Sequence, residues 1–445
     1  MTSPSDSQLT RVLKADEDRL ADVKIKHARV AELIERLEID AILLQKPANI
    51  SWFTAGGDVG RASCEMAAAV FITKDARVIV TNNVDAPQLF ERELFGLGFQ
   101  LKQRAWHESH PTLIADLCRG RKVVSDSGHR GTKNGENPIR QLRLQLTELE
   151  CDRMRRLSKV AVYAVEATAR RMYRGQTEAE LAGEVAHRLM KRTVTPELVR
   201  VCADGRSDRY RHWTYSSDPI EQYAHVSCIA RRWGLSVAVT RTVSLEPVPR
   251  ELEVAHRKAM LMHATGMFFS RNGQSLSDVW PKVHRIYEKF GLAHEWQVAD
   301  QADVIGYDPH EVRLTPDSDF QLQAPMAMHW HPSVGPAMLG DTILVQENEV
   351  EFVTLSRVWP RLTVEVKGHS VQCPDIYVVP DSTADGDDVQ VEVDITEAGD
   401  SQLMLFGSSD TDLHMDSVWE MEIDRSLLDD EPSEDTVSSL DTSPR

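Results

Sequence analysis

Short apolar runs alternate with amphipathic stretches over the first third of the chain. Apolar residues recur at helical spacing over 30–37, and the uninterrupted apolar run 41–44 follows them. Further strand-like runs come later, each separated from the next by a helical stretch. Strands that alternate with helices predict an α/β domain over 25–140, with Pro47 in the turn after its first strand.

The pattern changes near residue 141. A long amphipathic helix is predicted over 146–173, and Thr177 and Glu180 have the spacing of a capping box, which predicts that another helix begins there. Stretches rich in β-branched residues then alternate with two more helical ones. The pattern predicts an α+β body over 141–380.

The two ends of the chain have a different composition. Residues 1–24 are polar and predict a helical extension without an apolar leader, while 381–445 contains 20 acidic and two basic residues. The whole net charge of −18 therefore lies in this tail, which we expect to be partly disordered, with an edge strand at 389–395. The neutral body has no basic surface for nucleic acid, and no apolar run is long enough for a membrane span. We expect a cytoplasmic protein.

The six cysteines are scattered through the chain, and no two of them form a close C-x-x-C pair. This spacing argues against a zinc ribbon and a thioredoxin-like motif. In a reducing compartment such cysteines are typically buried thiols that act as small apolar side chains.

Six segments of the body occur in a characteristic order. They read LRLQLTELECDRMRRLSKVA, MYRGQTEAELAGEVAHRLM, VAVTRTV, VIGYDPHE, MAMHWHPSVG and GDTILVQEN. In this order and spacing they resemble the superfamily of creatinase, prolidase and methionine aminopeptidase, and the resemblance covers about 25–380. It implies an α+β fold, in which a pita-bread catalytic-type domain is preceded by a creatinase-type α/β N-terminal domain.

Most members of this superfamily hold two divalent cations with two Asp, one His and two Glu side chains. The resemblance places these positions on Ser227, Ala238, Asp303, His331 and Gly340. Ala238 and Gly340 have no side-chain donor, so the resemblance implies that the two-metal centre is missing. We accordingly expect no cofactor.

Three other residues match positions that contact substrate in the superfamily. His212 matches the histidine that is the proposed general base and acid in creatinase, its metal-free member, and His310 matches the histidine that polarises the substrate. Arg313 lies two residues after Glu311, in the region where creatinase has a substrate-binding arginine. The alternative for each is a structural role: a surface or structural histidine, or an arginine in a salt bridge.

A rebuilt metal site is a further alternative. His329 and His331 are two residues apart on a predicted strand, so their side chains point to the same face. With Asp303 they would form a set of two histidines and one carboxylate, which is suited to a transition metal. In the other interpretation these side chains simply fill the vacated site and hydrogen-bond to each other.

The loop 53–66 resembles the loop with which one creatinase protomer overhangs its partner's active site. It implies a homodimer in which Arg61 faces the neighbouring cavity. The sequence therefore leaves two main hypotheses. One is a metal-independent hydrolase or lyase acting on a C–N bond of a small amino-acid-like or peptide-like substrate, and the other is a catalytically inactive domain that binds a peptide or protein partner.

Overall fold

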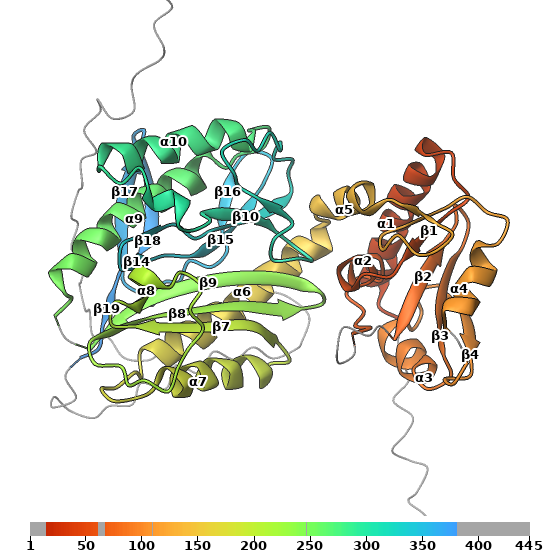
Figure 1. Ribbon diagram of the computed structural model, residues 1–445, viewed down its shortest axis with the longest axis horizontal. Helices are drawn as coiled ribbons and strands as arrows, with labels where there is room; N and C mark the ends of the chain where they lie inside the picture. The colour runs from red at the N-terminus through yellow and green to blue at the C-terminus, as the bar shows by residue number, and fades with distance from the viewer. Residues whose placement is uncertain (1–14, 61–66, 109, 246, 381–445) are drawn as a thin grey trace, which may run out of the picture.

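The computed structural model describes residues 15–60, 67–108, 110–245 and 247–380, which form two domains (Figure 1). The predicted edge strand at 389–395 and the rest of the acidic tail lie outside the described residues. No described helix is both long and apolar enough to cross a membrane.

The N-terminal domain contains a six-stranded mixed sheet, as the alternation of strands and helices predicted. Its strands, in order across the sheet, are β4 (Gln100–Arg104), β3 (Arg77–Asn82), β2 (Ala68–Ile72), β1 (Ala41–Leu44), β5 (Val123–Ser125) and β6 (Lys133–Asn134). Its helices are α1 (Glu17–Arg36), α2 (Pro47–Phe53), α3 (Ala86–Gln88), the π-helical turn η3 (Leu89–Glu93), α4 (His110–Cys118) and α5 (Glu136–Leu144).

Two local predictions for this domain need correction. Helix α1 begins at Glu17, inside the predicted extension 1–24, because the side chain of Asp16 accepts a hydrogen bond from the backbone of Arg19 and caps the helix. Val23 on its inner face is fully buried, so the domain begins earlier than residue 25. Pro47 starts helix α2 rather than a turn, since proline is readily accommodated in the first turn of a helix.

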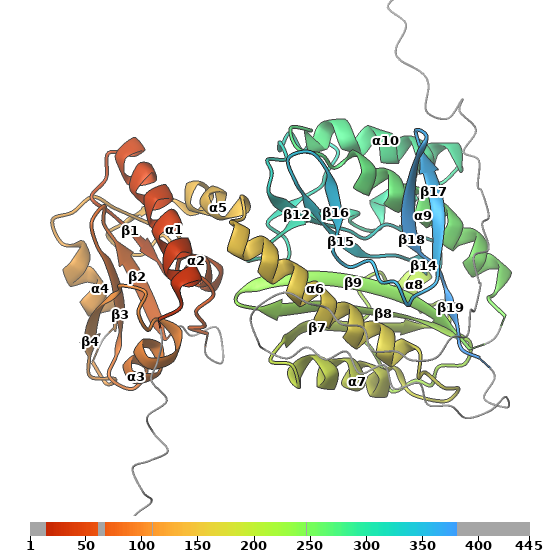
Figure 2. The same cartoon turned by 180° about the vertical axis from the view of Figure 1, so that it is seen from behind.

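The first layer of the larger domain is a four-stranded sheet covered by two helices. Its strands are β19 (Tyr377–Val378), β9 (Leu235–Ser244), β8 (Tyr223–Arg232) and β7 (Thr195–Ala203) in spatial order. Its helices are α6 (Glu148–Ala169) and α7 (Glu178–Met190), with the short α8 (Arg206–Arg209) after β7. Figure 2 shows α6 crossing the outer face of this sheet. The capping box of Thr177 and Glu180 is present at the start of α7, as predicted.

The second layer is a five-stranded sheet with its own helices. The sheet has the order β11 (Val312–Arg313), β10 (Ala302–Ile305), β12 (Met326–Trp330), β15 (Asp341–Val345) and β16 (Val350–Phe352). Two hairpins accompany it, β13 (Ser333–Val334) with β14 (Ala337–Met338) and β17 (Arg361–Val366) with β18 (His369–Pro374). The remaining helices are α9 (Arg250–Phe269), α10 (Leu276–Lys289) and the 3-10 turn η4 (Glu295–Gln297).

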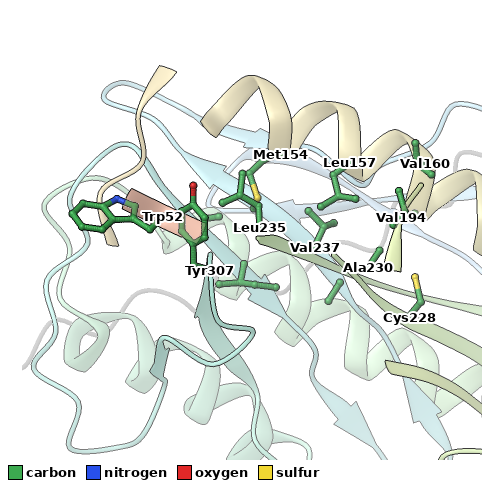
Figure 3. Packing of buried hydrophobic residues seen from close by; sticks show 14 of the residues in the cluster. Trp52, Met154, Leu157, Val160, Val194, Cys228, Ala230, Leu235, Val237 and Tyr307 are labelled. Carbon is green, nitrogen blue, oxygen red and sulfur yellow. The ribbon is translucent and has the colours of Figure 1, made fainter. Parts of the chain in front are cut away.

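Apolar packing against α6 covers one face of the β7–β9 sheet, so only the opposite face can contribute side chains to a site. Met154 and Leu157 of α6 pack on Leu235 and Val237 of β9, and all four side chains are fully buried (Figure 3). Side chains alternate between the two faces of a strand. The even-numbered residues of β9 therefore point away from α6, toward the second sheet.

A buried ionic cluster joins the two domains. Lys26 of α1 is fully buried, and its Nζ lies 2.5 Å from Asp22 and 2.7 Å from Glu150 of α6. The hydroxyl of Tyr307 donates to Glu150 at 2.6 Å, and its ring lies at the domain junction near Trp52 (Figure 3). A buried cation is tolerated when carboxylates surround it, so this cluster fixes α1 against α6.

A second buried cluster joins the two sheets of the larger domain. Arg241 of β9 lies 3.0 Å from Glu166 of α6 and 3.0 Å from Asp341 of β15, and it donates to the carbonyl of Thr354 at 2.6 Å. Arg241, Glu166 and Asp341 are all buried. Next to it, the backbone N–H of Thr240 donates to the carbonyl of Gly340 at 2.9 Å, which connects β9 directly to the start of β15.

Arg241→Met should strongly destabilise the protein, because it leaves two buried carboxylates without their cation. Removing one partner of a buried ion pair typically costs about 3–5 kcal/mol of the free energy of unfolding. We expect a loss of this size in urea denaturation, or insoluble expression. The control is Arg231→Gln on the neighbouring strand, where the half-exposed side chain lies 3.7 Å from Glu197. Equal stability of the two variants would contradict the structural role assigned to Arg241.

Candidate functional site

The faces of the two sheets enclose a cavity of about 150 Å³. Side chains from β7, β8 and β9 form its floor, and residues from β11, β12 and the neighbouring loops form its wall. The predicted residues that line it are His212, Ser227, Ala238, His310, Arg313, His329 and His331. The structure therefore brings together residues that are more than 100 positions apart in the sequence.

Asp303 is the centre of a hydrogen-bonded cluster in the wall. Its side chain is fully buried, and Oδ2 lies 3.0 Å from Nδ1 of His310 and 3.1 Å from Nε2 of His331. Burial alone would raise the pKa of Asp303, but the hydrogen bonds and charges of the two imidazoles outweigh it and hold this pKa below its ordinary value. The same hydrogen bond raises the pKa of His310 against the opposing effect of burial.

The N-terminal domain positions His310 through the next residue. Glu311 is buried and receives two hydrogen bonds from Arg143 of α5, at 2.7 Å and 2.6 Å. Arg140 donates to the carbonyl of Glu311 at 2.9 Å. These contacts hold the turn that carries His310, although half of the His310 side chain remains exposed.

His212 lies across the cavity in the loop after α8. Its side chain is 65% exposed, and Nε2 lies 4.0 Å from Oδ1 of Asp300. The neighbouring Arg211 holds this loop, because it donates to the carbonyl of Gly335 at 2.6 Å and pairs with Glu295 at 2.9 Å. His212 can therefore reach a ligand without losing a strong contact within the protein.

Arg313 and the pair of His329 and His331 differ in part from what the sequence predicted. Arg313 is half-exposed, and its Nε lies 3.6 Å from both Asp300 and Asp303, so it contributes to a charge network as well as lining the cavity. The rings of His329 and His331 stack with their centroids 4.6 Å apart and make no hydrogen bond to each other. The Nε2 of His329 is buried without a partner, and burial lowers the pKa of this imidazole well below its usual value.

The five positions of the two-metal centre do not fit a pair of cations. Asp303 and His331 are already bound to each other, and Ser227 hydrogen-bonds through Oγ to Thr240 at 2.8 Å. A Cβ atom at Gly340 would lie 2.7 Å from Oγ1 of Thr240, so even a small side chain there would need a shift of its neighbours. The adjacent Asp341 cannot act as a substitute, because it pairs with Arg241 on the other side of the strand.

One set of residues has the spacing for a single metal ion. Within the part of the chain that the structure describes, it consists of Asp300, Asp303 and His331. His329 is not a member, so the geometry does not support the predicted set of His329, His331 and Asp303. The guanidinium of Arg313 lies 3.6 Å from both carboxylates and already balances part of their charge.

Comparison with known proteins identifies the family. Residues 152–380, more than half of the chain, match the sequence profile of metallopeptidase family M24. The chain belongs to this M24 family. The resemblance to prolidases and related enzymes is thereby confirmed, as is the prediction of an α+β pita-bread domain preceded by an N-terminal α/β domain. Comparison with curated protein sequences gives no significant match.

Solved structures of the same fold cover both domains of this M24 chain. A prolidase from Pyrococcus horikoshii OT3 has 16% identity and a TM-score of 0.65, with 75% of this chain and 99% of that chain covered. Dipeptidase PepE from Mycobacterium ulcerans has 17% identity and a TM-score of 0.66, with 81% and 99% covered. The N-terminal domain of the FACT complex subunit SPT16 from Cicer arietinum has 13% identity and a TM-score of 0.61, with 77% and 97% covered. At these identities the likeness establishes the fold alone.

Sequence reasoning missed two charged residues of the site. Asp300 lies near His212 and Arg313, and Arg200 lines the floor from the middle of β7. The available signal for Arg200 was a lone cation between two valines in a strand-like run. Arg61 lies outside the described residues, so its contact with a neighbouring protomer stays a prediction. The five described cysteines are buried and unpaired, as expected.

The Asp303–His310 pair should make stability depend on pH. The pKa of His310 is raised in the folded protein, so its contribution is fully present below the unfolded value of about 6.5 and is lost as the pH rises through the folded value. His310→Gln should therefore lower the melting temperature more at pH 6 than at pH 9. The control is the exposed His107→Gln, for which we expect the same small effect at both values. A His310→Gln effect that is equal at both values would contradict the pairing.

Protein purified without added metal should contain well under one equivalent of manganese, cobalt, zinc or iron. The reason is that two of the five ligand positions lack donors and a third pairs with Thr240. Elemental analysis and melting curves with and without chelator measure this. One tightly bound equivalent that is lost in Asp303→Asn would instead indicate a rebuilt site at Asp300, Asp303 and His331.

Proposed function

We propose that this M24 chain is a metal-independent hydrolase that cleaves a C–N bond in a small amino-acid-like or short peptide-like substrate. Family membership supports peptidase-type C–N hydrolysis. The arrangement of two imidazoles is the observation that supports a mechanism without a metal ion. His212 lies beside Asp300, and His310 pairs with Asp303. Both histidines line the cavity, where two of the five metal-ligand positions, Ala238 and Gly340, lack side-chain donors.

The two histidines have complementary roles in this proposal. Asp303 raises the pKa of His310 and so favours its protonated form, which donates a hydrogen bond to the substrate carbonyl oxygen. His212 accepts a proton from a water molecule as the water oxygen attacks the carbonyl carbon. When the C–N bond breaks, His212 returns this proton to the leaving nitrogen. The products are a carboxylic acid and an amine, and both histidines regain their starting states.

A catalytically inactive binding domain is the second candidate. Ala238 and Gly340 support it, because they lack two of the carboxylates with which most members of the superfamily hold their metal ions. The N-terminal domain of the FACT subunit SPT16 has the same fold. In this candidate the cavity holds a peptide or a segment of a partner protein without turnover.

His212→Ala should lower kcat about 10²–10⁴-fold, the usual contribution of a general acid–base group. The fold should be unaffected, since 65% of the side chain is exposed. His310→Ala should raise KM more than it lowers kcat, if its main role is to position substrate. The assay is a screen of dipeptides and N-substituted amino acids for consumption by the full chain.

The exposed His294→Ala is the matched control, because His294 does not line the cavity and 72% of its side chain is exposed. It should retain full activity. If no compound of the screen is consumed, while one of them stabilises the wild type and His212→Ala equally, the binding-domain candidate replaces the hydrolase.

A further inference from the structure

Arg200 occupies the cavity floor, beside the position where the superfamily has its first aspartate. On β7 it is directly opposite Ser227 of β8, which is opposite Thr240 of β9, and Thr240 bridges to Gly340. Residues directly opposite each other in an antiparallel sheet point to the same face. Arg200 therefore belongs to the same row as two of the vacated metal-ligand positions, Ser227 and Gly340.

The guanidinium of Arg200 lacks the partners that the other arginines of the cavity have. Arg211 pairs with Glu295, and Arg313 lies between Asp300 and Asp303. Among the described residues, Arg200 forms no ion pair within 4.0 Å, and its buried Nε makes no hydrogen bond. Asp300 acts on it only as a more distant charge, and burial lowers its pKa, yet an arginine remains protonated at neutral pH.

Small side chains leave room in front of this guanidinium. Ser227 and Ala238 line the floor where two carboxylates would repel an anion. At the third carboxylate position, Gly340, contacts to Thr240 and His329 leave no room for a side chain. The hydroxyls of Ser227 and Thr240 hydrogen-bond to each other at 2.8 Å, which uses one of their two O–H donors and leaves the other free. The floor thus combines a fixed positive charge and a free hydroxyl donor with empty space.

We propose that Arg200 binds a carboxylate of the ligand on the cavity floor, with the remaining O–H of the Ser227–Thr240 pair as an additional donor. The planar guanidinium matches a carboxylate with two parallel hydrogen bonds, and a half-buried cation without a partner is costly until such an anion arrives. The ligand is therefore an acidic amino-acid derivative or a related small carboxylic acid. The inference deepens the proposed function and rests on it only for the statement that this ligand is turned over.

The test uses succinate as the probe, with uncharged succinamide and inorganic phosphate as comparisons, on the full chain at constant ionic strength. Isothermal titration should show succinate binding that weakens about ten- to a hundred-fold in Arg200→Met, the usual effect of losing a charge-assisted pair. Succinamide should not bind, and phosphate should bind less tightly than succinate. The melting temperature of ligand-free Arg200→Met should equal or exceed that of the wild type, because a purely structural arginine would lower it on removal.

Arg231→Gln is the matched control, since it removes one positive charge from the same sheet outside the cavity. Equal weakening by Arg231→Gln, unchanged binding in Arg200→Met, or no succinate binding by the wild type would overturn the proposal. Tighter binding of phosphate would overturn the carboxylate assignment. Should Arg200→Met not fold, Arg200→Lys keeps the charge without the planar fork, and unchanged affinity there would count against the proposal. His212→Ala should bind succinate within a few-fold of the wild-type affinity. A failure of carboxylate binding can then be distinguished from a failure of catalysis.

Discussion

The buried side chain of Arg241 on β9 connects helix α6, strand β15 and the segment that contains Thr354. It binds Glu166 of α6, Asp341 of β15 and the carbonyl of Thr354, all shielded from water. Because an unpaired charge in this interior would be strongly unfavourable, the two sheets can approach each other only in the arrangement that closes this cluster. The bridge between Thr240 and Gly340 follows from that arrangement, and with it the distance between the floor and the wall of the cavity.

Successive residues of a strand point to opposite faces, so one face of β9 and β15 carries the buried ion pair and the other faces the cavity side. Arg241 and Asp341 point into the interior, whereas Thr240 lines the cavity and Gly340 lies against Thr240 and His329. An acidic residue one position from a metal-ligand position is therefore no substitute for the ligand. The site then consists of two carboxylates, Asp300 and Asp303, beside imidazoles and the guanidinium of Arg313, and of Arg200 on the floor, which has no ion-pair partner among the described residues.

The N-terminal domain contributes to the site without lining the cavity. Arg143 of the N-terminal domain hydrogen-bonds to Glu311. The Lys26 cluster fixes α1 on α6, and Tyr307 hydrogen-bonds to Glu150 of this cluster. The turn that carries His310 is therefore held at Tyr307 before it and at Glu311 after it. Half of the His310 side chain is exposed, yet its backbone is tied to buried groups. An imidazole held in this way loses little entropy when it binds a ligand.

The sequence by itself determined the order of elements, the capping box of α7, the buried strand β1 and the loss of donors at Ala238 and Gly340. Periodicity and capping act within one turn or one strand, and no fold can restore a side chain that is missing. The tertiary structure alone decided that His329 does not join a metal-ligand set, and that Arg200 has no ion-pair partner among the described residues. These outcomes depend on cross-strand register and on packing between segments more than 100 residues apart, which no local pattern of residues encodes.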